Sequence, residues 1–133
     1  MLGDKLGESR GKRTARRVLP VDAGFKVEVS FEDRGTLLGI EGFGIGTYTS
    51  TSRPDGTMYG EGQGVFMTMD GEGATWKGSG VGKFVGGGAV SYRGALYYST
   101  ASQKLARLNA VACVFEFEVD TEGNTHSNIW EWK

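Results

Sequence analysis

The sequence contains little cysteine, histidine or proline and no long apolar run. Its 133 residues include one cysteine, one histidine and two prolines. The single cysteine, Cys113, cannot form an internal disulfide, and one cysteine with one histidine makes a poor metal site. We therefore expect no metal and no cofactor. The chain also lacks the apolar segment of a signal peptide and any stretch as long as a membrane-spanning helix, so we expect a cytoplasmic protein with no membrane partner.

The chain also lacks an excess of positive or negative charge, because its formal net charge is −1. No global basic field exists of the kind that gathers on nucleic acid. A basic cluster does lie near the start of the chain, at Arg10, Lys12, Arg13, Arg16 and Arg17. Because no aromatic residues alternate with these charges, we interpret the cluster as solvated and expect no nucleic-acid partner. We expect one domain over residues 1–133, with a flexible segment over residues 1–11.

Glycine is abundant, at 23 of 133 residues, well above the usual share of about 7%. Nine of these glycines form three triplets at alternate positions, each eighteen residues after the last: Gly42, Gly44, Gly46, then Gly60, Gly62, Gly64, then Gly78, Gly80, Gly82. Glycines two apart in a strand lie on one face, so each triplet removes side chains from one side of a strand. Three strands are expected to share this bare patch.

Turn signals rich in proline, aspartate and glycine divide the chain into strand-length pieces that alternate with period two. We predict strands near residues 12–20, 25–32, 36–51, 57–69, 74–85, 89–100, 109–119 and 125–132, with one helical turn over residues 102–108. Eight sequential antiparallel strands with one apolar side predict an all-β, mostly up-and-down barrel of the calycin or allene-oxide-cyclase-like type. A flattened sandwich is the main alternative.

The expected register supports a common interior face. Pairing residues 60–64 with 78–82 centres one hairpin on Gly71, and the next hairpin, centred on Gly87, sets Gly80 opposite Gly94. Even-numbered residues of the four central strands then share one side, which carries no charge. The odd-numbered side carries most of the polar residues, so we predict that it faces solvent.

The bare patch has two interpretations. On the first interpretation, aromatic rings from neighbouring strands fill the bare patch. On the second, the missing side chains leave a pocket with aromatic walls that include Phe84. An apolar pocket with a few hydroxyl and indole groups is the common form of a small-molecule site. On this second interpretation we predict ligand-binding residues at Gly44, Tyr48, Gly62, Phe66, Trp76, Gly80, Tyr92, Tyr98 and Cys113.

No catalytic residue is assigned. We interpret Cys113 as a buried thiol, because it shares an apolar face with Val111 and Phe115 and lacks the basic neighbour that a reactive cysteine needs. Most carboxylates are expected to face outward, including Glu116 and Glu118. Whether the protein is an enzyme stays open.

Several odd-numbered residues are apolar and would form one exposed patch on three adjacent strands: Phe43, Ile45, Val65, Met67, Val81 and Val85. Such patches usually mark association, which predicts a homo-oligomer. The alternative is that the N-terminal segment with Val18 and Leu19 covers them.

Four motifs carry a resemblance over residues 20–133: Tyr59-Gly60-Glu61-Gly62-Gln63-Gly64, Trp76-Lys77-Gly78-Ser79-Gly80-Val81-Gly82, Tyr92-Arg93-Gly94-Ala95 and Leu105-Ala106-Arg107-Leu108-Asn109. They resemble an uncharacterised family of small prokaryotic proteins, which is similar in turn to the allene-oxide-cyclase-like barrels. The plant cyclases would imply a trimeric barrel whose apolar pocket holds an oxidised fatty acid for ring closure. No catalytic residue is carried over, because no carboxylate is expected on the pocket face of the central strands.

These observations leave three functional hypotheses. The first is a barrel that binds a small apolar or aromatic ligand, the second an isomerase or cyclase acting on a lipid-like substrate, and the third a structural, oligomeric module with a filled barrel. A cavity beside the glycines favours the first, a titratable group lining that cavity favours the second, and a dry interior favours the third.

Overall fold

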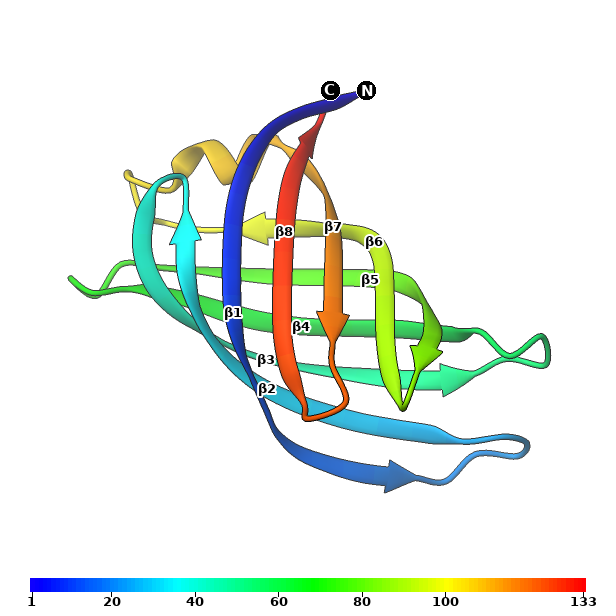
Figure 1. Ribbon diagram of the computed structural model, residues 1–133. Helices are drawn as coiled ribbons and strands as arrows, with labels where there is room; N and C mark the ends of the chain where they lie inside the picture. Colours follow the sequence, from blue (N-terminus) through cyan, green and yellow to red (C-terminus); the bar gives the residue numbers. More distant parts are fainter.

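The computed structural model describes all residues, 1–133, and forms one closed antiparallel barrel of eight strands in sequential order (Figure 1). The strands are β1 (Leu2–Leu19), β2 (Lys26–Leu37), β3 (Ile40–Ser52), β4 (Met58–Thr68), β5 (Gly73–Gly86), β6 (Ala89–Ser99), β7 (Ala112–Val119) and β8 (Asn124–Trp132), and a short 3-10 helix, η1 (Ala106–Ala110), connects β6 to β7. The predicted all-β, eight-stranded barrel is confirmed. No helix is long and apolar enough to span a membrane.

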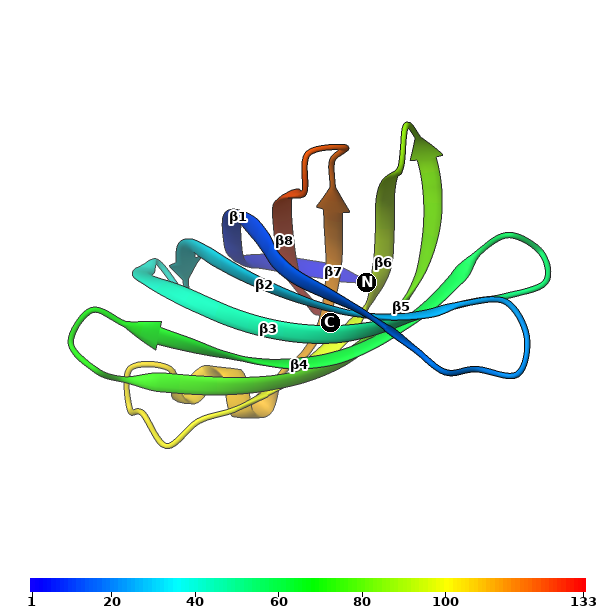
Figure 2. The same ribbon diagram turned by 90° about the horizontal axis from the view of Figure 1, so that it is seen from below.

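The strands curve around a common interior, and Figure 2 shows that β6, β7 and β8 run across the direction of β3 and β4. Pairing of β1 with β8 closes the barrel. The two chain ends lie side by side (Figure 1), where the Met1 ammonium donates to the Lys133 carbonyl oxygen at 2.7 Å.

The first strand is much longer than expected. Residues 2–11, predicted as a flexible segment, form the first part of β1 and pair with both β2 and β8. Closure explains the difference, because residues 2–12 supply the pairing edge on which β8 closes the barrel.

The boundary between the second and third strands was also misplaced. β2 continues to Leu37, and a two-residue turn at Leu38 and Gly39 leads into β3. Both turn residues have positive φ, at 53° and 76°. Such turns match the twist of a hairpin but normally use asparagine, aspartate or glycine at the first position, so Leu38 hides the signal.

The predicted face is confirmed, and one register is corrected. Gly60 pairs with Gly80 where Gly82 was expected, so the β4–β5 register is shifted by two residues and the hairpin centre moves from Gly71 to Asp70. A shift of two residues keeps every side chain on its face. Gly80 does lie opposite Gly94 in the β5–β6 hairpin, as expected.

Two clusters of buried side chains fill the two ends of the interior. The first gathers around η1, where Leu105 and Leu108 have no exposed surface and pack with Leu6, Leu37, Leu96, Tyr98 and Cys113. The second consists of Phe31, Tyr92, Phe117 and Val119. Trp76 and Phe115 contact both clusters, so they lie at the middle of the barrel.

Candidate functional site

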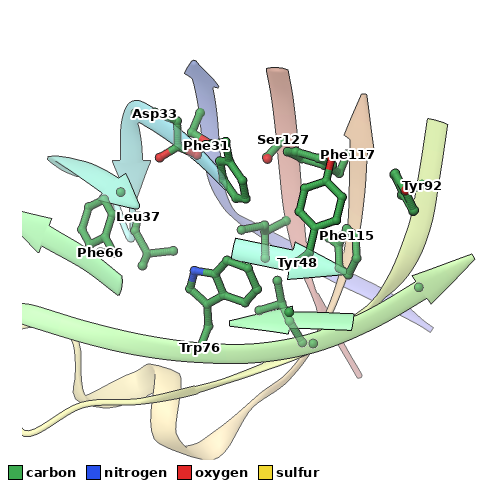
Figure 3. A pocket seen from close by; sticks show the side chains of 18 of the residues that line it. Phe31, Asp33, Leu37, Tyr48, Phe66, Trp76, Tyr92, Phe115, Phe117 and Ser127 are labelled. Carbon is green, nitrogen blue, oxygen red and sulfur yellow. Dashed lines mark hydrogen bonds between the residues drawn. The ribbon is translucent and has the colours of Figure 1, made fainter. Parts of the chain in front are cut away.

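A cavity of about 120 Å³, partly open to solvent, lies between the two clusters, with largely apolar walls drawn from strands all around the barrel. Eight of the nine predicted ligand-binding residues line it: Gly44, Tyr48, Gly62, Phe66, Trp76, Gly80, Tyr92 and Tyr98. The structure therefore brings these residues together around one space, as Figure 3 shows for Tyr48, Phe66, Trp76 and Tyr92.

Two residues expected near this space lie elsewhere. Cys113 is buried in the cluster around η1 and does not line the cavity. Burial, together with the nearby negative charge of Glu131, raises the pKa of its thiol to about 11. Phe84 is 54% exposed, because it lies close to the end of β5 beyond the second cluster.

Aromatic rings fill much of the space that the glycines leave, so each interpretation of the bare patch holds in part. A Cβ atom at Gly64 or Gly46 would meet the Trp76 indole at 2.5 and 3.0 Å. A Cβ at Gly42 would lie 2.5 Å from the ring of Phe66. The glycines thus admit rings that would not fit against side chains, and the cavity is the space that these rings do not fill.

The rings pack against one another in edge-on and tilted geometries. Tyr48 stands at 82° to Phe117 with centroids 5.7 Å apart, and Phe31 lies 5.2 Å from Phe117. Such aromatic pairs contribute about 0.5–1.5 kcal/mol beyond area burial, which keeps this wall of the cavity ordered without a ligand.

One carboxyl group, missed at the sequence level, faces the cavity. Asp33 lies on β2 opposite Gly44 of β3, and its carboxylate accepts hydrogen bonds from the Ser9 hydroxyl at 3.0 Å and from the Gly44 amide. Burial raises the pKa of Asp33 above its ordinary value, although these two hydrogen bonds oppose the rise. Residues 25, 27, 29 and 31 are apolar and lie on one face, and continued alternation would place Asp33 on the same face. The predicted strand ended at residue 32, so Asp33 was not considered.

Four polar groups on the cavity wall have no hydrogen-bond partner among the side-chain bonds of the protein. They are the hydroxyls of Tyr48, Tyr98 and Ser127 and the indole N–H of Trp76. Burial raises the pKa values of Tyr48 and Tyr98, so both stay protonated and act as donors. By contrast, the Tyr92 hydroxyl is already bonded to Ser50 at 2.7 Å.

The outer surface carries part of the predicted apolar patch. Phe43 pairs with Met67 and Ile45 with Val65 across β3 and β4, and Phe43 and Ile45 are exposed. Val81 lies apart from these four, opposite Tyr59. The N-terminal residues do not cover the patch, since Val18 pairs with Val27 inside the sheet and is 78% exposed.

The fold and the site together define a small closed β-barrel with an aromatic-lined interior cavity. No protein-family model matches the chain, and no curated protein does so either. Among solved structures, the chain is similar to a protein of unknown function from Clostridium acetobutylicum, with a TM-score of 0.83, 12% identity and 98% of each chain covered.

Further solved structures share the architecture. A beta-barrel like protein from Acinetobacter baumannii gives a TM-score of 0.82 at 15% identity, covering 100% of this chain and 96% of the other. An enzyme from Penicillium herquei gives 0.71 at 19% identity, covering 96% and 92%. The resemblance to uncharacterised small prokaryotic barrels is thereby confirmed as a likeness of fold.

Proposed function

We propose that this barrel binds a small, largely apolar or aromatic molecule in its interior. The observation that supports this is the cavity of about 120 Å³ among the aromatic side chains. An apolar cavity of about 150 Å³ in another protein holds benzene, so the space suits a compact, ring-sized body better than a long acyl chain. The unpartnered hydroxyl and indole donors would then bond one acceptor group on the ligand.

The first experiment is native mass spectrometry of the purified protein, followed by nuclear magnetic resonance titration with toluene and with phenol. We expect a co-purified molecule lost on denaturation, or chemical-shift changes centred on the amides of Gly44, Gly62 and Gly80. Bare protein whose cavity amides respond to neither probe would contradict binding and favour a filled, structural barrel.

A matched pair of variants ties binding to the cavity. Ser127→Leu places a larger side chain into the cavity from β8, whereas Asn128→Leu places the same side chain on the opposite face of that strand. We expect Ser127→Leu to weaken the response to phenol at least about tenfold, which corresponds to about 1.4 kcal/mol of binding free energy. Equal binding by both variants would argue against this cavity as the site.

An isomerase or cyclase is the second candidate function. The specific observation in its favour is Asp33, a titratable group on the cavity wall.

The cytoplasmic location and the absence of nucleic-acid and membrane partners stay predictions.

A further inference from the structure

Asp33 is a partly buried carboxyl group without a cationic partner. None of the ion pairs in the protein includes it, and its only bonds come from two neutral donors, Ser9 and Gly44. Carboxyl groups in apolar surroundings are normally paired, because burying a lone charge is costly. An unpaired carboxyl group at this position costs folding stability, which favours a functional reason for Asp33.

The strands on either side of Asp33 carry glycine where they face it. Gly11 of β1 and Gly44 of β3 are its cross-strand neighbours. A Cβ atom at Gly44 would overlap the Asp33 carboxylate, and one at Gly11 would lie 2.5 Å from the Asp33 Cβ. Gly44 thus leaves space for the carboxyl group, whereas Gly11 lets the β1 backbone approach the Glu32 carbonyl oxygen closely. The cavity wall includes Asp33 and Gly44 together.

Other charged groups near the cavity have their own partners or face outward. The Glu8 carboxylate bonds to Lys5 and to His126, and the hydrogen bonds from these two side chains lower its pKa to about 2. Glu61 is exposed. The tyrosines that line the cavity, Tyr48, Tyr92 and Tyr98, have raised pKa values and stay neutral. Asp33 is therefore the one carboxyl group on the cavity wall that is neither ion-paired nor exposed, and its pKa is raised by burial.

We propose that Asp33 is a general base and acid that shifts a proton on a small, mostly apolar carbonyl compound held in the cavity. This inference rests on the proposed binding function and adds the substrate class. The carbonyl oxygen would accept a hydrogen bond from one of the unpartnered donors on residues that line the cavity, Tyr48, Tyr98, Trp76 or Ser127. Figure 3 shows the side chains of Tyr48, Trp76 and Ser127 around this space.

The proton shift balances without any other reactant. The Asp33 carboxylate takes a proton from a carbon next to the carbonyl, and the electron pair of the broken C–H bond forms a C=C bond as the carbonyl oxygen gains negative charge. In a β,γ-unsaturated ketone, the protonated Asp33 then returns the proton to the γ carbon. The double bond moves into conjugation, the C=O bond re-forms and the carboxylate is restored. Hydroxyl donors stabilise the charged oxygen, and a carboxyl pKa raised by burial suits both steps.

The test uses 3-cyclohexenone, whose conversion to the conjugated 2-cyclohexenone changes its ultraviolet absorbance. Binding is followed separately, by chemical-shift changes of the Gly44 and Gly62 amides with the saturated ketone cyclohexanone. The variants are Asp33→Asn and the matched control Glu32→Gln, which removes a carboxylate from the adjacent, exposed position on the opposite face. Asparagine keeps an acceptor oxygen for Ser9 and Gly44, so the variant is expected to fold, which its amide spectrum checks.

We expect the wild-type protein and Glu32→Gln to isomerise the ketone, and Asp33→Asn to lose at least about 100-fold of kcat while still binding cyclohexanone. The wild-type rate should rise with pH as Asp33 deprotonates, with a midpoint above the ordinary aspartate value of 3.8. Binding without isomerisation, or equal rates for wild type and Asp33→Asn, would overturn the role of Asp33 and leave ligand binding intact. Failure of cyclohexanone, toluene and phenol to shift the cavity amides would instead overturn the binding function on which this inference rests.

Discussion

Individual glycines of the barrel differ in what a side chain would meet. A Cβ at Gly64 would lie 2.5 Å from three atoms of the Trp76 indole, whereas a Cβ at Gly73 would have its nearest neighbours at 3.5 Å. The indole is a rigid ring packed against both core clusters, so it cannot move aside without displacing others. Glycine is therefore required at position 64, whereas position 73 has room for a side chain.

This contrast makes a stability prediction. We expect Gly64→Ala to lower the free energy of unfolding by about 1–3 kcal/mol through overpacking. Gly73→Ala should change it by less than about 1 kcal/mol, in the stabilising direction, because alanine restricts the unfolded chain. Urea denaturation of the two variants measures both values, and an equal loss in both would show that Trp76 does not set the requirement.

Asp33 predicts a stability that depends on pH. Its pKa is raised in the folded protein, chiefly by burial, so the folded state holds the proton to a higher pH than the unfolded state. The contribution of Asp33 to stability therefore falls as pH rises from 3.8 through the folded pKa. We expect Asp33→Asn to melt at a higher temperature than wild type at pH 7, with the difference shrinking below pH 3.8. A variant that melts lower at pH 7 would contradict this sign.

The connection between β6 and β7 shows how a short element closes one end of the interior. Leu105 and Leu108 have no exposed surface, while Arg107 on the outside of η1 bonds to Asp4 at 2.8 Å and to Glu131 at 2.9 Å. The apolar side chains thus fill the end of the barrel, and the guanidinium links η1 to β1 and β8.

We expect the buried side chain to matter more than the ion pairs. Leu108→Ala should cost about 2–5 kcal/mol of unfolding free energy, because it leaves a hole in the cluster around η1. Arg107→Ala should cost less, about 1 kcal/mol, since the exposed pair with Asp4 contributes little and only the Glu131 carboxylate, which is 15% exposed, loses its partner. Denaturant titration measures the unfolding free energy of both variants. A larger loss of unfolding free energy in Arg107→Ala would show that the ion pairs matter more than the buried side chain.

At the level of elements, the sequence predicted what depends on local alternation and missed what depends on closure. Period two along β3 to β7 identified the interior face, because each strand has one buried side. The first strand was cut short because residues 2–11 show no clear alternation and become a strand through pairing with residues 124–132. The early end given to β2 hid Asp33.

The site was predicted as a set of residues, but its free volume was not. Eight predicted residues share the cavity wall because register alone places them there. Whether Phe66 and Trp76 turn over the glycines or away from them depends on side-chain rotamers, which contacts from distant strands decide. No pattern within one strand carries that information.

For the whole molecule, the exposed apolar residues of β3 and β4 keep the homo-oligomer a prediction. Phe43, Ile45, Val65 and Met67 form two adjacent cross-strand pairs on the outer face. If a second copy covers them, the protein should elute as an oligomer whose mass light scattering measures, and Ile45→Glu should shift it to monomer. A wild-type protein that stays monomeric at high concentration would contradict the homo-oligomer and would leave the proposed ligand binding in the cavity untouched.

The β1–β8 seam has a consequence for how the barrel is made in a cell. Residues 2–12 are synthesised before their partners on β8, residues 124–132, with the six other strands of the barrel in between. Throughout translation the outer edge of β1 has backbone groups with no strand to bond, and an open edge is a template for pairing with other chains. The ring closes after release of β8, through contacts that span nearly the whole chain, and such distant contacts form slowly. This newborn protein is thus most exposed to aggregation in the interval between the synthesis of its first strand and the arrival of its eighth.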